Sequence, residues 1–79
     1  MGDPPRLELF HAIADPGSAA ARRLLVERGL VEKIVFRNVT YPEAAAAHAT
    51  HGGGAIPALW DGERLHAGRD AVLARLAAL

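Results

Sequence analysis

The stretch LELFHAIADPGS, residues 7–18, carries the clearest structural signal in this 79-residue chain. Its first part alternates between two faces, with Leu7, Leu9, His11 and Ile13 on one and Phe10 and Ala12 on the other. Apolar side chains on both faces indicate an interior strand of a covered sheet. Asp15 followed by Pro16 then predicts a helix start, because an Asp side chain accepts from exposed helix amides and Pro has no amide to satisfy.

The sequence after this junction predicts a second strand. The helix is expected to run to Gly29, with an apolar stripe at helical spacing formed by Ala20, Ala21, Leu24 and Leu25, followed by Arg28. Residues 33–39, KIVFRNV, are rich in β-branched side chains and predict the next strand. A strand, a helix and a strand within about 33 residues favour a right-handed parallel unit.

The rest of the chain predicts one more helix, two strands and a final helix. Tyr41-Pro42-Glu43 begins a short Ala-rich helix through His48, which the glycines at 52–54 end. Residues 56–60 form a short apolar strand, Asp61-Gly62 predicts a two-residue hairpin, and residues 64–66 return. A helix from about Arg69 completes the order β-α-β-α-β-β-α.

Composition indicates one globular domain over residues 7–79, preceded by a disordered lead-in at residues 1–6 that carries Gly and two Pro. Nine basic residues balance nine acidic ones, so nucleic acid and anionic membranes are not expected as partners. The first residues do not have a signal-peptide pattern, and we expect a cytoplasmic location. The chain has no cysteine, which excludes disulfides, thiolate metal sites and thiol catalysis.

This order of elements, with Pro57 opening the third strand, resembles the thioredoxin fold, and most of all a glutaredoxin or the N-terminal domain of a glutathione transferase. Three local features carry the resemblance: the junction at Asp15-Pro16-Gly17-Ser18, the pair Ile56-Pro57, and Gly68-Arg69-Asp70 at the last helix. The resemblance implies an α/β fold, βαβαββα, with a four-stranded mixed sheet in the order 2-1-3-4. It also implies a cis Pro57 that leaves the backbone of Ile56 free to pair with an extended peptide such as glutathione.

The same resemblance shows what is missing. Asp15 and Ser18 occupy the two positions where glutaredoxins carry the cysteines of Cys-Pro-x-Cys, so thiol-disulfide exchange is excluded. Gly68, Arg69 and Asp70 match the place where relatives hold the γ-glutamyl group. Ala12 stands where a basic residue usually meets the glycyl carboxylate, and residues 44–47 are all alanine, so we expect weak or absent glutathione binding.

The expected function is a redox-inactive glutaredoxin-like binding module, without a cofactor, that recognises a peptide, a thiol compound or a protein. One alternative is a minimal glutathione-dependent transferase in which Ser18, the one catalytic candidate, donates to the thiolate of glutathione. Another is a structural subunit that associates through an exposed sheet edge or its second helix. Asp15 is either a helix cap or a group that orients a ligand amine or acts as a base, and Ser18 is otherwise a helix-terminal serine bonded to local backbone.

Three further side-chain groups are ambiguous. His48 and His51 are three residues apart and could share a metal ion, but two ligands are too few for a metal site. Both side chains are expected to be solvated or helix-terminal. Trp60 is either a core residue of its strand or an exposed anchor for a partner. Arg22 and Arg23 are expected on the solvent side of the first helix, near enough to Asp15 to help hold an anionic ligand.

Overall fold

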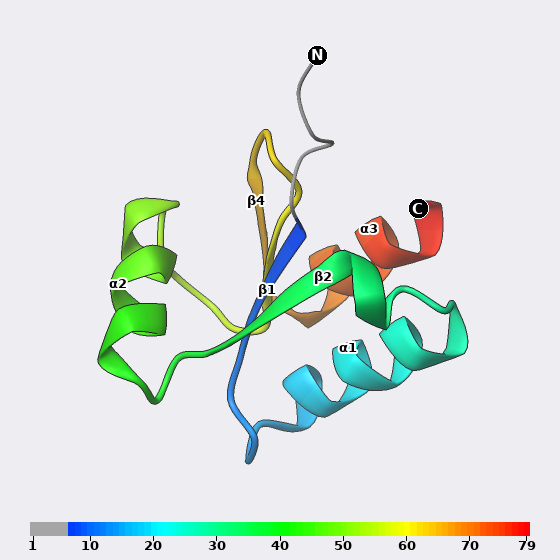
Figure 1. Ribbon diagram of the computed structural model, residues 1–79, viewed down its shortest axis with the longest axis horizontal. Coiled ribbons are helices and arrows are strands. Elements are labelled where there is room, and N and C mark those ends of the chain that lie inside the picture. Colours follow the sequence, from blue (N-terminus) through cyan, green and yellow to red (C-terminus); the bar gives the residue numbers. More distant parts are fainter. Residues whose placement is uncertain (1–6) are drawn as a thin grey trace.

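The computed structural model describes residues 7–79; the predicted lead-in at residues 1–6 lies outside the described residues. The chain forms β1 (Leu7–His11), α1 (Pro16–Glu27), a 3₁₀ turn η1 (Val31–Lys33), β2 (Ile34–Asn38), α2 (Pro42–Thr50), β3 (Ala58–Trp60), β4 (Leu65–Ala67) and α3 (Arg69–Ala78). Figure 1 shows these elements arranged around one sheet. No helix within residues 7–79 has the length and apolar character needed to cross a membrane.

The four strands lie in the order β2-β1-β3-β4. β1 is parallel to β2 and antiparallel to β3, and β3 is antiparallel to β4. Leu9 stands opposite Phe36 of β2 and opposite Leu59 of β3, which fixes the face that each side chain presents. The α/β architecture and the 2-1-3-4 order predicted from the sequence are therefore confirmed.

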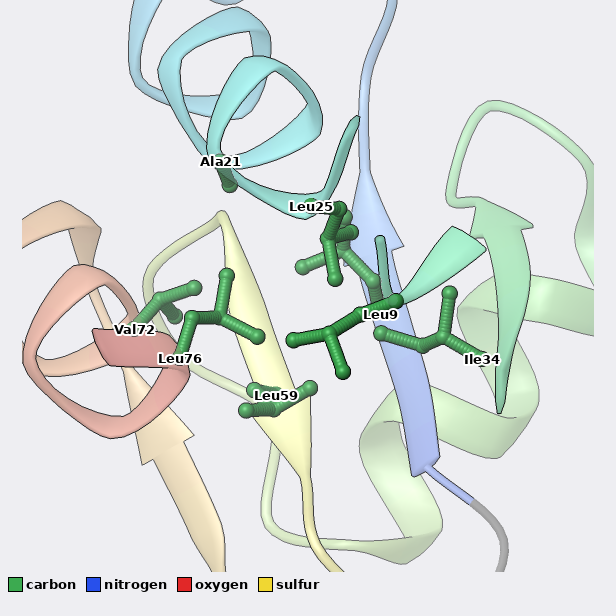
Figure 2. Close-up of a cluster of buried hydrophobic side chains, with 8 residues drawn as sticks. Leu9, Ala21, Leu25, Ile34, Leu59, Val72 and Leu76 are labelled. Carbon is green, nitrogen blue, oxygen red and sulfur yellow. The ribbon is translucent and has the colours of Figure 1, made fainter. Parts of the chain in front are cut away.

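Two helices cover one face of the sheet, and α2 lies on the other (Figure 1). The main core lies between the sheet and the pair α1 and α3, and Figure 2 shows leucines of α1, α3 and the sheet meeting there. Its buried members are Leu9, Ala21, Leu25, Leu30, Ile34, Leu59, Val72 and Leu76. In each helix the buried pair is four residues apart, the spacing that keeps two side chains on one helix face.

The structure corrects the bounds of all four predicted strands; β3, for example, begins at Ala58 rather than at Ile56. Two of these corrections have a clear local cause. β1 ends at His11 rather than at Ala14, because a turn in which the Asp15 amide donates to the Ala12 carbonyl (3.2 Å) brings Asp15 to the helix start. β2 begins at Ile34 rather than at Lys33, because the Lys33 amide donates to the Leu30 carbonyl (2.9 Å) and closes η1. Both corrections arise from local turns that a period-two pattern does not reveal.

The predicted two-residue hairpin is instead a four-residue connection over residues 61–64, between Trp60 and its partner Leu65. Oδ1 of Asp61 accepts from the amides of Glu63 and Arg64, both at 2.9 Å. An Asp side chain that bonds the backbone two and three residues ahead stabilises a longer turn than Asp-Gly alone indicates. This turn also sets the start of β4 at Leu65 rather than at Arg64.

Candidate functional site

Three segments that are distant in sequence meet around Gly17, in the first turn of α1. A Cβ placed on Gly17 would lie 3.1 Å from Cδ of Pro57, 3.3 Å from Oδ2 of Asp15 and 3.4 Å from Cβ of Arg69. The starts of α1 and α3 and the segment before β3 therefore form one surface. Only a residue without a side chain fits at position 17 without displacing a neighbour.

Pro57 ties this surface together. It is fully buried, and its carbonyl accepts from the amide of Gly68 at 2.8 Å, which links the start of β3 to the start of α3. The Ile56–Pro57 peptide bond is cis. Within residues 7–79 the amide and the carbonyl of Ile56 make no hydrogen bond, so Ile56 keeps a free backbone donor and a free backbone acceptor, one in the peptide unit on each side of it.

Asp15 places a carboxylate at the start of α1. Its Oδ2 accepts from the amide of Ser18 at 2.7 Å and from the Ser18 hydroxyl at 2.9 Å. An anion at this end of a helix is stabilised by the unpaired amides and by the helix dipole. Asp15 therefore acts as the predicted helix cap and fixes a negative charge beside Gly17 and Pro57.

Ser18 is fully buried, and its hydroxyl is occupied on both sides. Oγ donates to Asp15 and accepts from the amide of Ala12 at 3.2 Å. The hydroxyl is 0% exposed, and its one proton is donated to a carboxylate. It therefore cannot donate to the thiolate of a ligand. The geometry supports the reading of Ser18 as a serine bonded locally, and it gives the transferase alternative no support.

Ser18→Ala is expected to lower the free energy of unfolding by about 1–2 kcal/mol, because it leaves the partly buried Ala12 amide without its acceptor and removes one donor from Asp15. Urea unfolding measures this loss. Ser18→Thr, which keeps the hydroxyl, serves as the comparison and should recover part of it. A stability unchanged by Ser18→Ala would contradict the role assigned to the hydroxyl.

The start of α3 has no side-chain cap. Its N-cap residue is Gly68, at φ +93°, a conformation that side chains rarely adopt, and the following Arg69 and Asp70 are both exposed. The first amides of a helix need partners from outside its own hydrogen-bond ladder. These amides and the unpaired amide of Ile56 are hydrogen-bond donors on this surface, and no protein group in residues 7–79 accepts from them.

Arg22 is not on the solvent side of α1, whereas Arg23 is exposed as predicted. Arg22 Nη1 lies 3.1 Å from Nδ1 of His11 and also donates to the Ala12 carbonyl at 3.3 Å. A guanidinium can only donate, so Nδ1 of His11 accepts and the neutral ring carries its proton on Nε2. Burial, and secondly the charge of Arg22, lower the pKa of His11.

A second cluster, which the sequence did not predict, lies on the α2 face of the sheet. His51 stacks on Trp60 with ring centroids 4.0 Å apart, and His48 and His51 both pack against Phe10 at 5.3 and 6.0 Å. Nε2 of His48 is buried, so His48 is not solvated; the helix-terminal alternative is the correct one, because His48 lies in the last turn of α2 and His51 is its C-cap. Trp60 is only half buried, and it is a lining residue of this face rather than part of the main core.

The sequence pattern contains only part of the information needed to predict this cluster. Glu8 and Phe10 alternate with the core residue Leu9, and Glu8 stands opposite Trp60 in the sheet. Spacing put both histidines on one side of α2, but only the register shows that this side meets Trp60 and Phe10. Within the described part of the chain, no group of three or more His, Asp or Glu residues is placed to hold a metal ion.

No protein-family model matches the chain, and a search of curated proteins finds no similar sequence. Function is therefore inferred from the residues around Gly17.

Proposed function

We propose that this protein is a redox-inactive, glutaredoxin-like binding module that holds an extended peptide across the surface formed by Asp15, Ile56, Pro57 and the start of α3. The observation that carries the proposal is the unpaired amide and carbonyl of Ile56, next to the buried Pro57 at the meeting point of two helix starts. A free backbone donor and acceptor beside a sheet strand is the arrangement that recognises extended peptides.

The side chains around Ile56 favour reversible binding without a covalent step. A thiolate at the position of Asp15 would attack a disulfide, whereas a carboxylate accepts hydrogen bonds and carries a fixed charge. Asp15 already accepts from Ser18 twice, so the site is held rigid by contacts within the chain. A preorganised surface with no nucleophile suits reversible recognition of a peptide, a thiol compound or a protein segment.

Glutathione is the natural probe of this surface, although its affinity should be low. Ala12 offers no charge for the glycyl carboxylate, and the alanines at 44–47 offer none from α2. Arg22 has its guanidinium occupied by His11 and by the Ala12 carbonyl. The amides at the start of α3 remain as the main group that could meet the ligand's γ-glutamyl carboxylate.

The test is a titration of ¹⁵N-labelled protein with reduced glutathione and with an analogue in which alanine replaces its cysteine. We expect shift changes clustered at Ile56, Arg69 and Asp70, half-saturated in the millimolar range and equal for both probes, because the site has no thiol chemistry. Gly17→Val should abolish these changes, since its Cβ would lie against Pro57.

The matched control is Ala49→Val, at an exposed position of α2 away from the surface, which should leave the titration unchanged. The absence of clustered changes with both probes at millimolar concentration would overturn the proposal. Saturation at low micromolar glutathione would instead show that the predicted loss of affinity is wrong.

A further inference from the structure

α2 is held to the sheet by an unusual set of contacts. Its nine residues include five alanines, and Ala44 is its one buried residue. It is followed by Gly52, Gly53 and Gly54, all with positive φ (+125°, +65° and +92°), a backbone that few other residues adopt. With so little apolar surface on the helix, the larger side chains at its C-terminal end must supply much of its attachment.

Those side chains are His48 and His51. Both rings pack on Phe10, and His51 also stacks on Trp60. Imidazole is the side chain whose charge ordinarily changes between pH 5 and 8. The attachment of α2 therefore depends on two imidazole rings.

The charged groups on this face come from two strands. Glu8 of β1 accepts from Nε of Arg37, a β2 residue, at 2.9 Å, and its second oxygen lies 3.4 Å from Nε2 of His51. β3 presents Trp60 and β4 presents Leu65, neither of which ionises to meet a cation. Both carboxylate oxygens of Glu8 are thus occupied, and a charged His51 has a partner.

His48 has no such partner. Its Nε2 is buried without a hydrogen-bond partner in residues 7–79, and its ring lies against Phe10. A neutral imidazole can bury its unprotonated nitrogen without a hydrogen-bond partner at a modest cost in free energy. A protonated one must donate from both nitrogens, and burying that unpaired charge is far more costly than an exposed ion pair is favourable.

We propose that α2 is a pH-sensitive flap: protonation of His48 releases the helix from the sheet, with the glycines at 52–54 as its hinge, and uncovers Phe10 and Trp60. Charging of His51 opposes release through Glu8 and the face of Trp60, but this pair is partly exposed and its effect is smaller. A second positive charge three residues from His48 adds repulsion within the helix.

Two measurements on the whole chain test the flap. Trp60 is the sole tryptophan, so its emission reports on this face directly, and a reversible red shift is expected as the pH falls from 8 to 5. Hydrogen exchange, corrected for intrinsic rates, should show protection of the α2 amides falling by about tenfold over the same range while β1 and β3 stay protected.

His48→Phe keeps a ring against Phe10 without a titratable nitrogen and should abolish both changes, whereas His51→Gln should retain them. If His48→Phe does not fold, His48→Gln provides the same test. The proposal is overturned if the red shift persists in the folded His48 variant, if wild type shows no change, or if α2 and the core strands lose protection together.

Discussion

Replacing Asp61 with alanine is expected to lower the free energy of unfolding by about 2–3 kcal/mol, the range for losing several hydrogen bonds to one buried charge. The carboxylate lies in the turn between β3 and β4. It accepts from the amides of Glu63 and Arg64, and its Oδ2 lies 2.7 Å from Nε2 of His66 and 3.2 Å from Nε of Arg75. One side chain thus orders the turn, β4 and α3 together.

Urea unfolding monitored by circular dichroism measures this loss. Glu63→Ala is the matched control, because it removes an exposed carboxylate from the same turn but keeps the backbone amide that Asp61 holds; we expect a change within about 0.5 kcal/mol. A similar loss in both variants would show that general charge in the turn, rather than the bonds of Asp61, stabilises the connection.

The same carboxylate makes stability depend on acid. Its pKa is held well below its usual range, first by the Arg64 amide, then by His66, with the Glu63 amide and Arg75 adding to the effect against the opposing effect of burial. The folded state therefore binds its proton at lower pH than the unfolded state, whose pKa is about 3.9. The stabilisation is complete above that value and is lost as the pH falls through the acid range. Asp61→Asn should flatten the fall of the unfolding free energy below pH 4.

Local signals in the sequence predicted most of the fold. Asp15-Pro16 marked the start of α1, and the alternation around Leu9 assigned the faces of β1. Both depend on interactions within a few residues, which is why they can be read without a structure. The convergence of Gly17, Pro57 and Arg69 was expected only through resemblance to a known family, and the structure places the three together.

Contacts between distant segments could not be predicted in the same way. From the sequence, Asp61 is only part of a short hairpin turn, because no local pattern indicates that Arg75 reaches it from α3. Likewise, His51 reaches Trp60 and Glu8 only after the sheet register and the turn at 52–54 are fixed. Each of these side chains has an ordinary local role and acquires another through packing.

Asp15→Cys is expected to create a reactive thiol in a chain that otherwise has none. The Ser18 amide and hydroxyl now point at Oδ2 of Asp15, at 2.7 and 2.9 Å, and would donate to a thiolate in its place. With the positive end of the α1 dipole, these donors should lower the thiol pKa below the usual value of about 8.5. The pH dependence of alkylation by iodoacetamide gives this pKa directly.

Val26→Cys is the matched control, because Val26 lies at the other end of the same helix, where the dipole is negative, and is 68% exposed. Its thiol should keep a pKa near or above about 8.5, whereas the thiol at the helix start should reach half-maximal reactivity at lower pH. If both thiols titrate alike, the donors of Ser18 do not stabilise an anion at the start of α1. The fixed carboxylate would then be a helix cap alone, and the proposed binding surface would rest on Ile56 and α3 without it.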